Sequence, residues 1–401
     1  MTKKRLAYFF VFITSVISIL VLANNSRYKR LTSEDNNQTN KQLTNVSSSL
    51  EKAIDQYDIQ IDSILKKHKT VGAAIAIVYK DSILYTKCHG VKNCKTNDSI
   101  DKHTVFRLAS VSKAVTGVLS GILVNENKID LQSKVKTYLP TFKLKDSINT
   151  YNLTIENLLD HTTGLVPHAY DNLVESGVEY NRILNNLEKV RISAPPGKLY
   201  GYQNVTFSLV DTIFKSATKT PFDKLINEYV FEPFCMQDAS VGLEAFEQNP
   251  NIAYPHHKNI FRYKKLKLNK GYYNTIPAAG VNASITDMAN LIVNLLKDDQ
   301  FTNQLTNTIF KPRIITPLGR RYLRSWGEIN SKYYGLGWRI LNYRGHQVAY
   351  HGGYIKGYKT ELAIFKDLDF GIVYLSNSPD KSAALSIPTF LNLYLPSLQG
   401  S

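Results

Sequence analysis

At residues 106–113 the sequence reads FRLASVSK, and an apolar run at helical spacing follows directly. The run predicts a buried helix over 110–125, with Ser110 at its start and Lys113 one turn further on. Residues three apart lie on one face of a helix, so a hydroxyl is brought beside an amine. A desolvated amine can accept the hydroxyl proton, which makes the serine a candidate nucleophile. Serine also precedes lysine by three residues at seven other positions, so the helical context distinguishes Ser110 rather than the spacing.

Strand patterns lie at both ends of the chain, on either side of a mostly helical middle region. The predicted strands cover 72–79, 82–88, 334–341, 347–351, 358–365 and 370–375. The other predicted helices cover 50–68, 155–161, 205–217, 222–231, 285–297 and 381–395. Thr154 and Ser284 are predicted N-caps, and Pro388 should kink the last helix.

This arrangement predicts an α+β fold in which an antiparallel sheet, flanked by helices, is built from N- and C-terminal segments. A mostly α-helical region of about 116–300 is inserted between them, within one catalytic domain of 49–401. A cleft is expected where the two parts meet, which is a usual place for a ligand site.

The composition indicates a globular protein. Of the 401 residues, 43% are hydrophobic and 20% are charged, which excludes disorder for most of the chain. The net charge of +16 is scattered, with no run of five Lys or Arg, so we expect no nucleic-acid partner. Three cysteines exclude a disulfide scaffold; Cys88 and Cys94 either pair across a short loop or remain separate thiols, with Cys235 left over.

Residues 1–23 have the pattern of an export signal, because three basic residues precede an apolar run over 6–23. The run is also at the lower limit for a membrane span, so an uncleaved signal anchor is the alternative to cleavage after Ala23. Residues 24–48 are rich in Asn, Ser, Thr and Gln and are expected to form a disordered tether. We therefore expect an exported protein, periplasmic or otherwise extracytoplasmic, with a membrane tether through 6–23 if the signal is retained.

A second polar motif is Tyr202-Gln203-Asn204, which follows a Pro-Pro-Gly turn and precedes a predicted helix. A phenol there can shuttle a proton, and the amide of Asn204 can hold a substrate carbonyl or orient the lysine. The same triplet type recurs at Tyr170 and Tyr272, which remain alternatives.

A third motif, His351-Gly352-Gly353, ends a predicted strand and leads into Tyr354. Two glycines let a ligand lie close to backbone amides, and such an amide can donate to an oxyanion.

These three motifs resemble those of the serine β-lactamase and penicillin-binding protein family, whose nucleophile motif is Ser-x-x-Lys. The chain looks most like the class C branch and the related D,D-peptidases and esterases. In that branch a Tyr-x-Asn triplet holds the second position, and His-x-Gly holds the third in some members. The resemblance covers about 50–380 and implies the fold of that family.

The resemblance implies acyl transfer in two steps. Ser110 would attack a carbonyl, with Lys113 and Tyr202 as the base pair, and either of these two would then activate water for deacylation. The oxyanion would lie between the backbone amides of Ser110 and Tyr354, and His351 would help to hold the anionic end of the substrate. We expect no metal and no other cofactor, because the His and Cys residues form no close cluster of a zinc type.

The expected substrate is a small molecule or a peptidoglycan-derived peptide. A β-lactamase-like serine hydrolase is favoured, with a D,D-carboxypeptidase or an esterase as alternatives. The Lys-Thr-Gly of class C enzymes is absent and His351 stands in its place, so we expect anionic substrates to bind better as the pH falls from about 7.5 to 6. Two other interpretations are a catalytically silent cell-wall or partner-binding protein and a membrane-surface protein.

Overall fold

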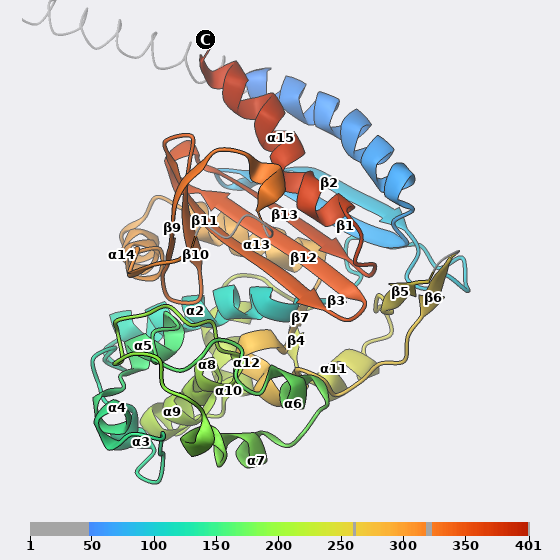
Figure 1. Ribbon diagram of the computed structural model, residues 1–401. Coiled ribbons are helices and arrows are strands. Elements are labelled where there is room, and N and C mark those ends of the chain that lie inside the picture. The colour runs from blue at the N-terminus through green and yellow to red at the C-terminus, as the bar shows by residue number, and fades with distance from the viewer. Residues whose placement is uncertain (1–47, 260–261, 318–322, 400–401) are drawn as a thin grey trace, which may run out of the picture. The chain divides into compact units, whose positions relative to one another are not determined.

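The computed structural model describes residues 48–259, 262–317 and 323–399 (Figure 1). The predicted export segment 1–23, and the predicted tether as far as residue 47, lie outside the described residues. The described chain divides into two units, one of residues 48–60 with 390–399 and one of residues 61–389. The predicted site residues all belong to the larger unit.

The smaller unit consists of two helical segments. Residues 48–60 belong to a helix over 48–68, and residues 390–399 belong to α15 (Ser382–Gln399). Ala53 and Tyr57 lie one turn apart and are buried. The ring of Tyr57 meets that of Phe390 edge-on, with the ring centroids 5.5 Å apart, so aromatic packing joins the two segments.

The larger unit is built on an antiparallel sheet, as the sequence predicts. Its eight described strands have the order β2-β1-β13-β12-β11-β10-β9-β8 (Figure 1). The N-terminal hairpin lies beside strand β13, where Ile75 pairs with Tyr374. The strands are β1 (Gly72–Tyr79), β2 (Ser82–Gly90), β8 (Ile314–Ile315), β9 (Ile329–Tyr334), β10 (Arg339–Tyr343), β11 (His346–Ile355), β12 (Tyr358–Phe365) and β13 (Phe370–Ser376).

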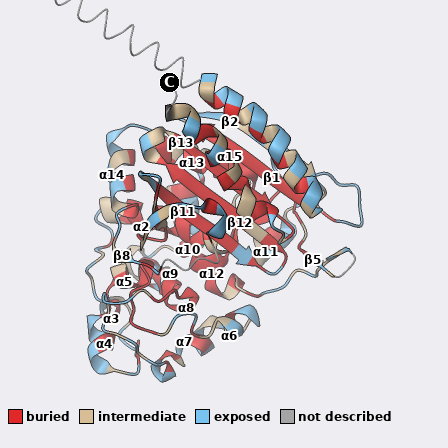
Figure 2. Ribbon diagram, turned by 45° about the horizontal axis from the view of Figure 1, so that its top comes forward, coloured by how far each residue is buried: buried red, intermediate tan, exposed pale blue. Residues whose placement is uncertain are grey.

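Helices cover the sheet and form most of the chain between its two halves. Helix α13 packs against β1 and β13, and α2 packs against α14. Figure 2 shows β1 and β12 as largely buried strands. The helices are α2 (Ser112–Asn125), α3 (Val135–Tyr138), α4 (Ser147–Asn152), α5 (Ile155–Leu159), α6 (Asp171–Glu175), α7 (Tyr180–Leu184), α8 (Asn204–Phe207), α9 (Leu209–Thr218), α10 (Phe222–Ile226), α11 (Leu243–Gln248), α12 (Ile276–Ala279), α13 (Ile285–Leu296) and α14 (Gln300–Ile309).

Short elements complete the larger unit. Two small sheets contain β3 (Phe106–Arg107), β7 (Val281–Ala283) and β4 (Ser240–Val241), and β5 (His256–Lys258) with β6 (Tyr263–Lys265). The single turns are η1 (Ala109–Val111), η2 (Leu187–Lys189), the π-turn η3 (Asn227–Phe231), η4 (Tyr273–Thr275), η5 (Arg324–Trp326) and η6 (Lys366–Leu368).

Both predicted N-caps are confirmed. The side chain of Thr154 accepts a hydrogen bond from the backbone N–H of Asn157 at the start of α5. Ser284 and Asp287 form a reciprocal capping box at the start of α13. These side chains satisfy backbone donors that the first turn of a helix leaves without partners, which is why local sequence can predict them.

The predicted single strand over 334–341 is wrong, because β9 ends at Tyr334 and β10 begins at Arg339. The intervening turn contains Gly337, whose backbone φ of +74° favours glycine. A Cβ at Gly337 would lie 2.1 Å from the carbonyl oxygen of Lys113, so this turn passes directly against α2. The predicted helix over 205–217 is also divided, into α8 and α9, whereas α15 continues through Pro388 as one helix.

Two further observations concern membrane-spanning helices and cysteines. Nowhere in 48–259, 262–317 or 323–399 is a helix both long enough and apolar enough to cross a bilayer. Cys88, Cys94 and Cys235 are exposed free thiols, so of the two alternatives for Cys88 and Cys94 the structure has separate thiols.

The contact between α2 and the β9–β10 turn yields a stability prediction. A Cβ at Gly117 would lie 2.1 Å from the backbone carbonyl oxygen of Leu336. A Cβ at Gly121 would lie 2.5 Å from Ile309 Cγ2 and 2.7 Å from Leu305 Cδ1, so its close contacts are with side-chain atoms. Alanine gains about 1 kcal/mol of helix propensity over glycine at either position. We expect Gly117→Ala nevertheless to lower the free energy of unfolding by ~1–3 kcal/mol, because a backbone carbonyl cannot rotate away as a side chain can.

Urea denaturation of Gly117→Ala and of the matched control Gly121→Ala measures this difference. The control should be less destabilised. Equal stability of the two variants would contradict the close approach of the β9–β10 turn to α2.

Candidate active site

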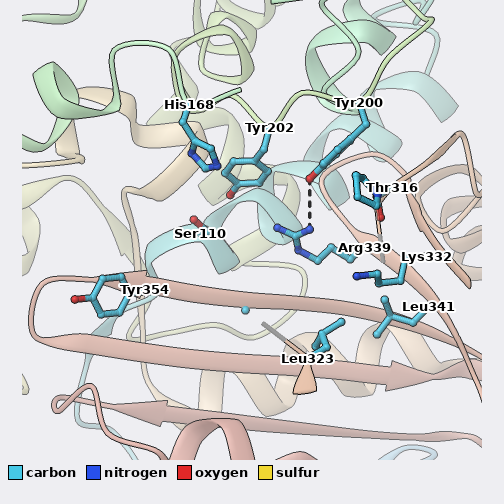
Figure 3. A pocket seen from close by; sticks show the side chains of 12 residues that line it. Ser110, His168, Tyr200, Tyr202, Thr316, Leu323, Lys332, Arg339, Leu341 and Tyr354 are labelled. Carbon is cyan, nitrogen blue, oxygen red and sulfur yellow. Dashed lines mark hydrogen bonds between the residues drawn. The ribbon is translucent and has the colours of Figure 1, made fainter. Parts of the chain in front are cut away.

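Ser110 opens onto a cavity of about 430 Å³ (Figure 3). Figure 3 shows Tyr202 and His168 next to each other on one side of the cavity and Tyr354 on another, with Ser110 between them. The lining residues are Ser110, His168, Tyr200, Tyr202, Thr316, Pro317, Leu323, Lys332, Arg339, Leu341, Gly352 and Tyr354. Two predicted catalytic residues thus share one cavity, although 92 positions of sequence separate them.

Two hydrogen bonds of Leu108 fix the segment that leads into Ser110. The N–H of Leu108 donates to the carbonyl of Val281 over 3.0 Å, and the carbonyl of Leu108 accepts from the Thr360 hydroxyl over 2.8 Å. Ala109 then takes the left-handed conformation, with φ at +51°. A non-glycine residue there stores strain that surrounding contacts must offset, which is common next to a reactive side chain. Ser110 follows in the turn η1 and is half-buried.

Lys113 lies one turn further, completely buried in the first turn of α2. Its Nζ donates to Asn204 Oδ1 over 2.6 Å and to the carbonyl of Ala278 over 2.9 Å. The Nζ atom also lies 4.7 Å from the centre of the Tyr202 ring. Desolvation lowers the pKa of Lys113 well below its ordinary value. The charge of Asp171 opposes this shift and the charge of Arg339 adds to it.

Tyr202 and Asn204 approach Lys113 from the loop that leads into α8. The Tyr202 ring packs against the buried imidazole of His161, with centroids 4.4 Å apart. Asn204 is buried and donates from Nδ2 to Asp171 over 2.9 Å, so its amide bridges the lysine and a carboxylate. These contacts are compatible with the lysine-orienting alternative for Asn204, and its role stays a prediction.

The two other Tyr-x-Asn triplets lie elsewhere. The hydroxyl of Tyr170 donates to the carbonyl of Asn186, and Tyr272 lines a separate, smaller cavity with Arg107 and Lys356. Neither tyrosine lines the cavity of Ser110.

His351 lies behind the cavity wall and does not line it. Its imidazole is completely buried, with Nε2 2.9 Å from the Tyr334 hydroxyl and Nδ1 3.0 Å from the carbonyl of Gly352. Burial lowers the pKa of His351 well below its ordinary value, and the charges of Arg339 and Lys113 lower it further. The environment therefore opposes the expected charging of His351 between pH 7.5 and 6, while its role in substrate binding stays a prediction.

Gly353 and Tyr354 continue β11 past this point. A Cβ at Gly353 would lie 2.4 Å from the carbonyl oxygen of Leu108 and 2.2 Å from the hydroxyl oxygen of Thr360, so β11 approaches the backbone before Ser110 too closely for a side chain. Tyr354 is exposed and lines the cavity with Ser110. The predicted oxyanion position between the backbone amides of Ser110 and Tyr354 is compatible with this proximity and stays a prediction.

The sequence did not indicate several of the cavity residues. Arg339 and Lys332 line the cavity from β10 and β9, and among the described residues no carboxylate lines it. Burial and the charge of Arg339 lower the pKa of Lys332. His168, which also lines the cavity, was missed as well. No local pattern marks these side chains, because folding alone brings their elements to one cavity.

Comparisons with known proteins identify the family of this chain. Residues 51–392 match the family model described as Beta-lactamase. Unguisins hydrolase ungD' of Aspergillus campestris is 26% identical over 77% of this chain and 58% of its own length. Protein flp of Staphylococcus aureus strain MRSA252 is 24% identical over 80% of this chain and 62% of its own length. The chain thus spans about three fifths of these relatives.

Among solved structures, the octameric penicillin-binding protein homologue from Pyrococcus abyssi has the same fold. It superposes with a TM-score of 0.74 at 19% sequence identity, covering 86% of this chain and 77% of its own. The family match, the shared fold and the grouping of Ser110, Lys113 and Tyr202 lead to one conclusion: the chain belongs to the beta-lactamase family, whose members are usually serine hydrolases.

Proposed function

We propose that this chain is a serine hydrolase that acts through an acyl-enzyme on Ser110. One observation carries the proposal: a half-buried serine faces a cavity, and a completely buried lysine amine lies one helical turn behind it beside Tyr202. A buried amine with a lowered pKa is a base that can take the serine proton.

The hydrogen bonds of Lys113 fit its neutral form. A neutral amine has two N–H donors, and the two acceptors, Asn204 Oδ1 and the Ala278 carbonyl, use both. The Nζ atom of Lys113 then has one lone pair left, which can accept the proton of Ser110. Asn204 in turn is fixed by Asp171, so the amine is held in a single orientation.

The reaction proceeds in two steps. Ser110 Oγ attacks the acyl carbon while Lys113 and Tyr202 take its proton and pass it to the leaving group. The oxyanion that forms lies at the backbone amides of Ser110 and Tyr354, where one such donor typically contributes ~10²–10³ in rate. Water then hydrolyses the acyl-enzyme.

The charge of the cavity favours an acyl donor with an anionic group. Arg339 and Lys332 line it, and no carboxylate of the described chain does. Tyr200 accepts a hydrogen bond from Arg339 over 3.4 Å. We therefore favour a carboxylate-bearing β-lactam or a D-Ala-D-Ala-type peptide over a neutral ester. The export pattern of 1–23 supports an extracytoplasmic location, where such substrates occur.

The first prediction concerns the nucleophile. After incubation with a β-lactam or a p-nitrophenyl ester, mass spectrometry of proteolytic peptides should locate the adduct on Ser110. Ser112 should not react, because it is buried and its Oγ accepts the backbone N–H of Val281 over 3.0 Å. Ser110→Ala should abolish the adduct.

An adduct on Ser112 would overturn the assignment of the nucleophile. Absence of an adduct with every donor, including a fluorescent penicillin, would instead favour a catalytically silent binder.

The second prediction concerns Tyr202. Tyr202→Phe preserves the packing of the ring against His161 and deletes only the hydroxyl. We expect kcat/KM to fall by ~10²–10⁴, the range typical of general acid–base catalysis. The matched control is Tyr272→Phe, outside the Ser110 cavity, which should change kcat/KM by less than about threefold. The reverse result would identify Tyr272 as the functional tyrosine.

The third prediction separates Arg339 from His351 as the group that binds the substrate carboxylate. The measurement is the ratio of kcat/KM for a carboxylate-bearing β-lactam to that for a neutral ester with a similar leaving group. In Arg339→Gln the ratio should fall roughly tenfold or more, because a hydrogen bond to a charged group contributes about 1.5–3 kcal/mol. In His351→Asn it should change little. A fall in His351→Asn alone would assign the carboxylate to His351.

A further inference from the structure

His168 is a cavity residue to which the two-step mechanism gives no role. Its side chain is 60% exposed and lines the cavity together with Ser110. The ring lies beside that of Tyr202, with centroids 5.4 Å apart (Figure 3). The backbone N–H of His168 donates to the carbonyl of Tyr202 over 2.8 Å, so the positions of the two residues are linked.

Asp171 orients the imidazole. The Nδ1 atom of His168 lies 2.7 Å from Asp171 Oδ2, and since a carboxylate only accepts, the proton resides on Nδ1. In the neutral ring Nε2 then carries a lone pair, as in a histidine that a carboxylate prepares for general-base catalysis.

The same carboxylate also reaches the catalytic lysine. Asp171 Oδ1 accepts from Asn204 Nδ2 over 2.9 Å, and Asn204 Oδ1 accepts from Lys113 Nζ over 2.6 Å. A continuous hydrogen-bonded chain thus joins the exposed imidazole to the buried amine, through one side chain of α6 and one of α8.

The backbone around His168 is unusual as well. His168 and Tyr170 both adopt the left-handed conformation, with φ at +60° and +63°. Such residues persist only where surrounding structure over-determines them, and they cluster at functional sites. Two other histidines in the described chain, His103 and His346, also contact an aspartate through Nδ1, but neither lines this cavity.

We propose that His168, oriented by Asp171, is the general base that activates water for hydrolysis of the Ser110 acyl-enzyme. The water oxygen adds to the acyl carbon while one water proton passes to His168 Nε2. The bond between the acyl carbon and Ser110 Oγ then breaks, and Oγ takes a proton from the Tyr202–Lys113 pair. The imidazolium releases its proton to solvent and the pair regains one, so that ester and water become acid and free serine.

This inference rests on the proposed acyl-enzyme mechanism. It assigns a different base to each of the two steps of that mechanism. Lys113 with Tyr202 serves acylation, and His168 serves deacylation. Loss of His168 Nε2 should therefore leave acylation intact and trap the covalent intermediate.

The test is His168→Asn in the full chain. Asparagine tolerates the left-handed backbone, and its amide N–H can replace Nδ1–H toward Asp171, while Nε2 is lost. The matched control is His346→Asn, which alters the equivalent pair with Asp367, 2.7 Å apart, away from the cavity. Acylation by p-nitrophenyl acetate and by a chromogenic cephalosporin is followed by stopped-flow absorbance, and decay of the isolated adduct by intact-mass spectrometry.

We expect the acylation rate of His168→Asn to stay within about threefold of wild type while its deacylation rate falls by ~10² or more. Hydroxylamine, a stronger nucleophile than water, should restore turnover because it needs no general base. His346→Asn should match wild type in both steps.

Deacylation of His168→Asn within threefold of wild type would overturn this inference alone, as would loss of acylation or failure of hydroxylamine to restore turnover. If wild-type protein forms no adduct on Ser110 with either donor, the proposed hydrolase function fails first, and this inference with it.

Discussion

The complete burial of the Lys113 amine is the constraint on which the site depends. A charged ammonium without solvent is costly, so burial favours the neutral form and creates a base. Its N–H donors must still be satisfied, because an unpaired buried donor costs about 1–3 kcal/mol. Asn204 at the start of α8 and the carbonyl of Ala278 in α12 provide the acceptors. One side chain thereby fixes three helices around the nucleophile.

The backbone of the sheet approaches the segment that carries Ser110 and Lys113 closely at two glycines. The β9–β10 turn at Gly337 passes the carbonyl of Lys113, and Gly353 of β11 passes the carbonyl of Leu108. Neither position has room for a Cβ. The hydroxyl of Thr360 in β12 adds a hydrogen bond to Leu108, so neighbouring strands hold the segment before the nucleophile. These contacts explain how a strained residue at Ala109 is maintained.

Buried histidines and the cations that line the cavity occupy different parts of the site. His161 and His351 are completely buried, and burial, aided by the charges of Lys113 and Arg339, lowers the pKa of both imidazoles well below the ordinary value. Arg339 and Lys332 instead face the cavity. The proposed recognition of an anionic substrate therefore rests on Arg339 of β10 and Lys332 of β9, while the role of His351 in substrate binding stays a prediction.

The sequence by itself determined the features that depend on near neighbours: most of the helix predicted over 110–125, the capping box at Ser284, and the short apolar runs that form most strands of the sheet. It failed over 334–341, where Gly335 and Gly337 lie in a turn that divides the strand and packs against α2. The family resemblance favoured Tyr202 among three Tyr-x-Asn triplets, but only the tertiary structure placed it in one cavity with the serine and brought His168 and Arg339 to the same cavity. The physical reason is that periodicity and capping act over a few residues, whereas cavity formation and desolvation depend on elements far apart in the chain.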